Sequence, residues 1–196
     1  MKVYLRADTE ETSWDDVMTR MEVAQRENLR PTMLEKLVHD PHYRVREALA
    51  ANRTVPVAIL KQLADDEDSS VRIKVAYNPN TPTNVLLHMV RHNPFDTCAG
   101  QALAQRRNAS PQILEELSHN KNPYVLTAVA DNPNTPTSVL TTLAKHLDWE
   151  IRLHVCSNPN TPTPVLAILA KDRSSAQVRR HAQNMLEYRH EYQRGE

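Results

Sequence analysis

Leucine recurs at a nearly fixed interval along most of this chain, and a second apolar position follows it three residues later. Successive reference leucines are 26, 26, 28, 26 and 26 residues apart. They are Leu34, Leu60, Leu86, Leu114, Leu140 and Leu166, and the second positions are Leu37, Leu63, Met89, Leu117, Leu143 and Leu169. Apolar residues at i and i+3 share one face of a helix. The spacing therefore predicts a short first helix in each of six repeats.

Each repeat carries a further apolar pattern at i, i+4 and i+5, which is again one helical face. Its members are Val45/Leu49/Ala50, Val71/Val75/Ala76, Ala99/Leu103/Ala104, Val125/Val129/Ala130, Ile151/Val155/Cys156 and Val178/Ala182/Gln183. Such short helices are unstable alone and must stack on their neighbours. The sequence thus predicts an all-α solenoid of six two-helix repeats of about 26 residues, with second helices that are either α or 3₁₀.

The string Asn-Pro-Asn-Thr-Pro occurs three times, at Asn78–Pro82, Asn132–Pro136 and Asn158–Pro162. A residue before proline is pushed out of the helical region, so a second helix must end there. Proline is also favoured in the first turn of a helix, and threonine is a good N-cap. We therefore expect this string to form the corner between repeats, with Thr81 and its equivalents, and Ser110, capping the next helix.

The ends of the chain differ from the repeats. Residues 1–27 predict an extended piece and a capping helix, with Ser13 as its N-cap and Trp14 on its apolar side. Residues 28–182 hold the repeats, and residues 183–196 extend the last helix into a tail. We expect a single domain with capping helices at both ends.

The run Val71–Leu86 resembles the leucine-rich repeat variant family, in which Val-Arg-x-x-Val-Ala-x-Asn-Pro-x-Thr-Pro leads into Val-Leu-x-x-Leu-Ala and an Asp. The match is also close around Ile151–Asp172, looser around Val45–Asp66, and extends over about 28–180. Asp40-Pro41 followed by Val45-Arg46 is similar to the HEAT repeat. The resemblance implies a right-handed superhelix of α and 3₁₀ helices that acts as a binding scaffold, with no reaction. A branch of the variant family carries an N-terminal cysteine cluster for an iron–sulfur centre, but residues 1–97 contain no cysteine.

Composition narrows the function classes. The 24 basic and 24 acidic residues balance, so no global field favours nucleic acid or an anionic membrane. The start shows no signal-peptide pattern, no run reaches transmembrane length, and the two cysteines lie in different repeats. These features predict a cytoplasmic monomer with reduced thiols. We expect another protein as partner, with no cofactor and no enzymatic activity.

Arginine follows the core valine or isoleucine of the second helix in four repeats, at Arg46, Arg72, Arg152 and Arg179. Three of these repeats carry an aspartate six residues after the reference leucine: Asp40, Asp66 and Asp172. The sequence predicts a structural ladder of partly buried pairs within repeats, such as Asp66 with Arg72. In the fifth repeat, which has His146 at the acidic position, Asp148 is expected to replace the missing carboxylate.

Positions on the second helix that differ between repeats are candidates for a binding surface. Ile73, Tyr77 and Leu153 are apolar there without a reason inside their own repeat. The hypothetical concave protein-binding surface consists of Ile73, Lys74, Tyr77, Leu153, His154, Arg180 and His181. The alternative is that the apolar members pack between repeats.

Other chemistry is poorly supported. His88 and His92 lie i, i+4 but lack a third ligand nearby in sequence, so no metal site is predicted. Cys156 stands where other repeats have a packed alanine, and buried thiols are usually inert.

The alternative function is a DNA-backbone binder similar to the HEAT-like alkylpurine glycosylases. Trp149 beside Asp148 and Glu150 is then the candidate aromatic and acidic group. The phosphate contacts are Arg152, Lys171, Arg179 and Arg180. The zero net charge and the expected pairing of the arginines disfavour this alternative.

Overall fold

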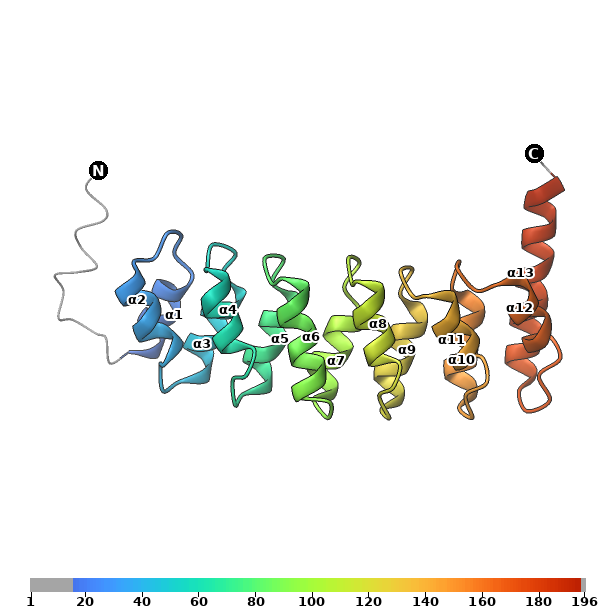
Figure 1. The fold of residues 1–196 in the computed structure, drawn as a ribbon, viewed down its shortest axis with the longest axis horizontal. Coiled ribbons are helices and arrows are strands. Elements are labelled where there is room, and N and C mark those ends of the chain that lie inside the picture. The colour runs from blue at the N-terminus through green and yellow to red at the C-terminus, as the bar shows by residue number, and fades with distance from the viewer. Residues whose placement is uncertain (1–15, 195–196) are drawn as a thin grey trace. The chain divides into compact units, whose positions relative to one another are not determined.

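The computed structural model describes residues 16–194, and side chains up to Glu191. Thirteen α-helices and no strand occur in this part of the chain (Figure 1). They are α1 (Val17–Ala24), α2 (Pro31–Val38), α3 (Tyr43–Ala51), α4 (Val57–Leu63), α5 (Ser69–Tyr77), α6 (Thr83–His92), α7 (Thr97–Ala104), α8 (Pro111–Leu117), α9 (Pro123–Asp131), α10 (Thr137–Leu143), α11 (Trp149–Ser157), α12 (Thr163–Leu169) and α13 (Ala176–Arg194). The fold is all-α and built from repeated helix pairs, as predicted.

The second helices are α-helices rather than 3₁₀-helices wherever the structure describes them. The chain divides into two compact units, Met1–Val85 (unit 1) and Leu86–Glu196 (unit 2). Second helices of successive repeats pack on one another inside each unit (Figure 1): α1, α3 and α5 in unit 1, and α7, α9, α11 and α13 in unit 2. The predicted boundary between residues 27 and 28, where the repeats were expected to begin, lies between α1 and α2. The predicted boundary between residues 182 and 183, where they were expected to end, lies inside α13.

The core consists of the predicted apolar columns. Both leucine columns are buried from Leu34 to Leu169, and so are the second-helix columns from Val45 to Ala182. Gln183, the last predicted member, is exposed because it lies on the outer side of α13. Burial of a leucine side chain contributes about 1.5–3 kcal/mol, so these columns supply most of the driving force for stacking.

The corner segments join neighbouring repeats through asparagine side chains. In unit 1, Asn78 Nδ2 donates to the carbonyl oxygens of Ala50 at 2.8 Å and Asn52 at 3.0 Å, at the end of α3 in the preceding repeat. Asn78 Oδ1 accepts from the backbone N–H of Asn80 at 2.9 Å. The last carbonyls of a helix lack intrahelical partners. The buried amide of Asn78 therefore provides hydrogen-bond donors for the end of the preceding helix and an acceptor for the backbone of its own corner.

The same arrangement recurs inside both units. Asn52 donates to the carbonyls of Ala24 and Arg26. Asn132 donates to those of Ala104 and Arg106, and Asn158 donates to those of Ala130 and Asn132. Each of these asparagines also accepts from the N–H two residues later, at 2.9 Å. The first asparagine of the corner is thus a buried link between repeats.

The corner threonines do not cap the next helix as predicted. Thr81 Oγ1 donates to the carbonyl of Val75 at 2.7 Å, in the last turn of the preceding helix α5. The hydroxyls of Thr135 and Thr161 make the same contact, at 2.5 Å, with residues six positions earlier. The buried hydroxyl lies against the end of the preceding helix, where carbonyl acceptors are in reach.

Helices α10 and α12, which follow two of these corners, begin without a side-chain cap. The residues in the N-cap position of α10 and α12 are Pro136 and Pro162. Ser110 does cap α8, as predicted, and its Oγ accepts from the N–H of Ile113 at 3.4 Å. The predicted cap Ser13 and its neighbour Trp14 lie outside the described residues; the cap of α1 is Asp16.

Arg189 of α13 occupies the place of the next asparagine at the last corner. Its Nη1 donates to the carbonyl of Thr161 at 2.6 Å, and its Nη2 donates to those of Pro159 at 3.0 Å and Asn158 at 3.5 Å. In the interior of the stack, the equivalent carbonyl of Asn132 accepts from Asn158. Arg189 thereby contacts two carbonyls, those of Asn158 and Pro159, whose equivalents Asn132 and Pro133 accept hydrogen bonds from the following repeat.

We predict that Asn78→Ala lowers the free energy of unfolding by about 2–4 kcal/mol, because buried carbonyls that lose a donor cost about 1–3 kcal/mol each. Urea unfolding followed by far-UV circular dichroism measures this loss. Asn80→Ala is the matched control: its exposed amide contacts the carbonyl of Arg53, and its loss should cost less than about 1 kcal/mol. Equal losses for the two variants would contradict the linking role of Asn78.

Candidate functional site

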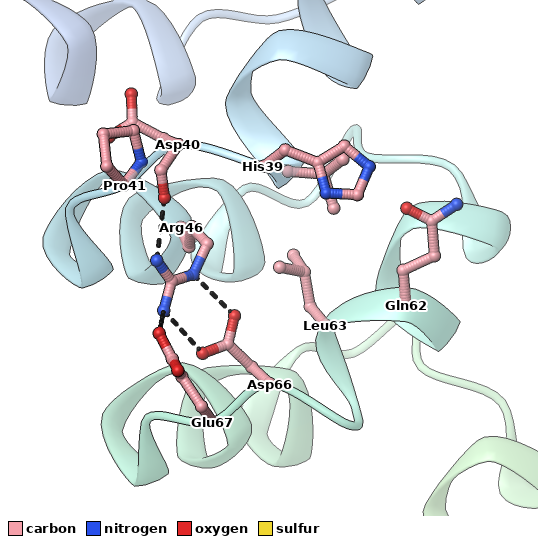
Figure 2. Close-up of a pocket in the computed structure, with 9 residues that line it drawn as sticks. His39, Asp40, Pro41, Arg46, Gln62, Leu63, Asp66 and Glu67 are labelled. Carbon is pink, nitrogen blue, oxygen red and sulfur yellow. Dashed lines mark hydrogen bonds and ion pairs between the residues drawn. The ribbon is translucent and has the colours of Figure 1, made fainter.

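Arg46 of α3 lies between two successive repeats in unit 1 (Figure 2). Its Nε donates to Asp66 Oδ2 at 2.7 Å, and its Nη2 donates to Asp66 Oδ1 at 3.0 Å and Glu67 Oε1 at 3.2 Å. Its Nη1 donates to the backbone carbonyl of Asp40 at 2.7 Å. Because the Arg46 and Asp66 side chains are both over nine-tenths buried, this bidentate pair fixes the position of one repeat on the next.

The pairing differs from the predicted ladder. Each arginine was expected to pair with the aspartate of its own repeat, but Arg46 pairs with Asp66 of the following repeat. Arg72 instead donates to the backbone carbonyls of Asp66 at 2.6 Å and Glu67 at 3.0 Å. Only a backbone acceptor lies within reach six residues earlier, because the aspartate side chain turns toward the preceding repeat.

Unit 2 contains the same contact near its C-terminal end. Arg152 Nε donates to Asp172 Oδ2 at 2.7 Å, and its Nη1 donates to the carbonyl of His146 at 2.6 Å. Arg179 donates to the carbonyl of Asp172 at 2.7 Å. Asp148, expected to pair with Arg152, is instead the N-cap of α11 and accepts from the N–H of Glu150.

Arg20 was missed by the sequence analysis. Its Nε donates to Asp40 Oδ2 at 2.7 Å, and both side chains are buried. It stands 26 residues before Arg46, and this interval could have identified it. Helix α1 therefore contacts the first repeat as a second helix would, although no leucine column precedes it.

Repeats without the arginine are joined differently. Gly100 stands in the arginine position of α7, and a Cβ added there would lie 3.4 Å from Val125 Cγ2. The neighbouring turn has Asn120 in place of the aspartate, and its Nδ2 donates to the carbonyl of Pro94 at 2.9 Å. An amide donor thus reaches the preceding turn where no arginine is present.

The pKa values of Asp172 and Arg46 are shifted by their surroundings in the ion pairs. Burial alone would raise the pKa of Asp172, but the hydrogen bonds from Arg152 and Ser174 hold that pKa well below its usual range. The hydrogen bond to Asp66 raises the pKa of Arg46 despite its burial. Both shifts favour the charged form, of the Asp172 carboxylate and of the Arg46 guanidinium.

A cleft of about 420 Å³ lies beside Arg46 (Figure 2). It is lined by Val38, His39, Asp40, Pro41, Arg46, Gln62, Leu63, Asp66 and Glu67. Arg46, Asp40 and Asp66 are engaged in the inter-repeat contacts. Among residues 16–191, no three His, Cys, Asp or Glu side chains gather in a way that could hold a metal ion. The cleft is thus a consequence of repeat stacking.

The hypothetical binding residues fall into two groups, one in each unit. In unit 1, Tyr77 of α5 is 50% exposed, whereas Ile73 and Lys74 are half-buried. Lys74 Nζ lies 3.4 Å from Glu47 Oε1 of α3. The exposed aromatic ring thus adjoins an ion pair that joins the two second helices.

In unit 2, Leu153, His154 and His181 are half-buried, and Arg180 is exposed. His154 Nδ1 lies 2.6 Å from Asp131 Oδ1 of α9. Ser157 Oγ lies 2.9 Å from His181 Nε2 of α13. The variable positions therefore combine contacts between repeats with an accessible polar surface.

The candidate nucleophiles and histidines are placed as follows. Burial raises the pKa of Cys156 to about 12, so its thiol is protonated near neutral pH and is a poor nucleophile. Cys98 is exposed on α7. His88 and His92 stack at 4.0 Å on α6. Neither cysteine is associated with a general base in the hydrogen bonds described.

The arginines named for the alternative function are partly engaged. Arg152 is paired with Asp172, and Arg179 contacts the backbone of Asp172. Lys171 and Arg180 are exposed, and Trp149 is 39% exposed at the start of α11. Binding to a DNA backbone stays a prediction that rests on the exposed cations.

The chain is similar to a leucine-rich repeat variant. The solved structure is described as "a leucine-rich repeat variant with a novel repetitive protein structural motif". The two are 24% identical, the match covers 79% of this chain and 71% of that chain, and the TM-score is 0.38. No protein-family model and no curated protein matches the chain.

None of the described helices is both long and apolar enough to cross a bilayer.

We predict that Arg46 and Asp66 are energetically coupled. A double-mutant cycle with Arg46→Ala and Asp66→Ala should give a coupling energy of about 2–3 kcal/mol, the upper part of the range of about 0.5–3 kcal/mol for residues in one hydrogen-bond network. The matched cycle with Arg72→Ala and Asp66→Ala should give less than about 1 kcal/mol, because the carbonyl that Arg72 contacts survives the substitution. A larger coupling energy for Arg72 with Asp66 than for Arg46 with Asp66 would support pairing within repeats. Unfolding in urea measures the free energies for both cycles.

We also predict that Asp172 makes stability depend on acid pH. Because the pKa of Asp172 is lowered by folding, its contribution is present above its unfolded pKa of about 3.9 and is lost as the pH falls below it. Asp172→Asn should cost about 3 kcal/mol at neutral pH, and the difference from wild type should shrink as the pH falls below about 4.

Unfolding free energies measured over this pH range test the prediction. The control is Arg173→Gln, which changes an exposed neighbour in the same turn and should leave the profile unchanged. A difference between wild type and Asp172→Asn that stays constant with pH would contradict it.

Proposed function

We propose that this protein is a non-enzymatic repeat scaffold that binds another protein through the accessible side of its second helices. The motif residues Asn78, Thr81 and Arg46 are buried in contacts that join repeats. Every buried side-chain nitrogen or oxygen of the described residues has a hydrogen-bond partner. A frame whose polar groups are satisfied internally is suited to present a variable surface.

The observation that carries the proposal is the position of Tyr77. It is half-exposed on a second helix, beside the half-buried Ile73 and the Lys74–Glu47 ion pair. Tyrosine is enriched in the centres of protein interfaces, because it buries a large ring and keeps a hydrogen-bonding group. The corresponding positions of unit 2, Leu153 and His154, form a second candidate surface of the same type.

A comparison of captured proteins tests the proposal. Tagged full-length protein, produced in its native cells, should capture a partner that Tyr77→Ala and Ile73→Asp do not capture. Val57→Ala is the matched control, because Val57 is 47% exposed on the first helix α4, and it should capture the partner normally. With the purified partner, Tyr77→Ala should weaken binding at least about tenfold by calorimetry.

The stability of the Ile73→Asp variant distinguishes a role of Ile73 in a binding surface from a role in packing between repeats. Ile73→Asp should leave the melting temperature nearly unchanged if Ile73 contributes mainly to a binding surface. A large loss of stability would mean that Ile73 packs between repeats, and the test then rests on Tyr77→Ala. Equal capture by wild type and Tyr77→Ala would overturn the proposal for unit 1.

A further inference from the structure

Exposed apolar side chains recur on the turns that join the two helices of a repeat in unit 2. Phe95, in the turn between α6 and α7, is 92% exposed, and Tyr124, at the start of α9, is 68% exposed. Leu147, in the turn between α10 and α11, is 97% exposed, and Trp149 follows it. Single exposed apolar residues are ordinary. All four lie within two residues of the first residue of a second helix, in three successive repeats, and such a gathering of exposed apolar residues is characteristic of an interaction surface.

These turns lie along one edge of unit 2. Helices α7, α9 and α11 pack side by side, and each apolar residue lies at or just before the start of one of them. The first two turns are joined by hydrogen bonds from Asn120 to Pro94 and from Asn122 to Thr97. A surface held in place by the fold loses little entropy on binding.

The charges on this edge favour an acidic partner. Lys121, Lys145 and Lys171 are exposed in successive turns, and they form no ion pair with the described residues. Two nearby carboxylates are engaged: Asp148 caps α11, and Asp172 pairs with Arg152. Glu150, beside Trp149, is an exposed acid on the same edge. The exposed charged side chains that lie among the aromatic residues of this edge are therefore mainly positive.

The spacing of the turns selects the conformation of the partner. Axes of packed helices are about 8–10 Å apart, so the starts of the successive second helices α7, α9 and α11, where these side chains lie, recur at about that distance. A polyproline II segment returns to the same face every three residues, or about 9.3 Å. One face of a β-strand repeats every two residues, or about 6.7 Å. Aromatic side chains are also the usual docking groups for proline rings.

We propose that this turn edge, formed by Phe95, Lys121, Tyr124, Lys145, Leu147 and Trp149, binds an acidic, proline-rich segment of a partner protein in the polyproline II conformation. The aromatic rings contact prolines, and the lysines contact carboxylates between them. The edge lies at the helix starts, apart from the second-helix surface proposed above. It does not depend on that surface.

Peptide binding to the full chain tests this proposal. The probes are fluorescein-labelled peptides of about fifteen residues built from Pro-Pro-Asp, Pro-Pro-Ser or Pro-Pro-Lys triplets. The acidic peptide should bind at least about tenfold more tightly than the neutral one by fluorescence anisotropy, and its affinity should fall with salt. The basic peptide should not bind at concentrations up to about 1 mM.

Variants assign the binding to the turn edge. Tyr124→Ala with Trp149→Ala, and separately Lys121→Glu with Lys145→Glu, should each weaken binding of the acidic peptide at least about tenfold. The matched control is Tyr188→Ala on α13, because Tyr188 is exposed to a similar extent, 62%, and lies away from the turns. Circular dichroism verifies that each variant is folded.

Three outcomes would overturn the proposal. The first is the absence of binding by the acidic peptide at about 1 mM protein. The second is equal binding by the three peptides, or equal loss in the Tyr188→Ala control. The third is tighter binding of a poly-thymidine oligonucleotide of about fifteen nucleotides than of the acidic peptide, which would assign the aromatic and basic groups to single-stranded nucleic acid.

Discussion

The stack depends on the buried asparagine that begins four of its corners, Asn52, Asn78, Asn132 and Asn158. A helix of seven to nine residues leaves about half of its carbonyls without intrahelical partners, and these repeats have no glycine at the corner to close the helix on itself. The missing donors come from the next repeat, as Asn78 supplies them to Ala50 and Asn52. Hydrogen bonding within a repeat is therefore complete only when its neighbour is folded. This requirement couples neighbours more directly than apolar contact does.

The buried ion pairs fix how one repeat is positioned on the next, and they contribute little to the free energy of stacking. A pair such as Arg46 with Asp66 gains little over a well-packed apolar pair, but either member left alone is costly. Apolar columns can slide on one another with small losses, whereas a bidentate contact with 2.7 Å and 3.0 Å hydrogen bonds cannot. The leucine columns thus drive stacking, and the asparagine and arginine contacts set its register. Where Gly100 replaces the arginine, the amide of Asn120 reaches the preceding turn instead.

The sequence predicted the buried columns because periodicity reports burial directly, and Leu34 through Leu169 lie where the spacing placed them. It did not predict the partner of Arg46. An aspartate six residues earlier and one twenty residues later are both within reach of a long side chain, and only the stacking of helices distinguishes them. Thr81 is similar: a hydroxyl can accept from the following helix or donate to the preceding one, and the position of the carbonyl of Val75 decided it. The exposure of Tyr77 and Trp149 also follows from packing that spacing alone does not encode.

Arg189 has a consequence for assembly. An array whose repeats join by donating to the carbonyls of their neighbours ends in a row of open acceptors, much as a β-sheet ends in an unpaired edge strand. Such an end can receive the first repeat of another molecule, and head-to-tail contacts of this kind grow into filaments. The guanidinium of Arg189 covers the acceptors of Asn158, Pro159 and Thr161. A second molecule could therefore use these acceptors only by displacing Arg189.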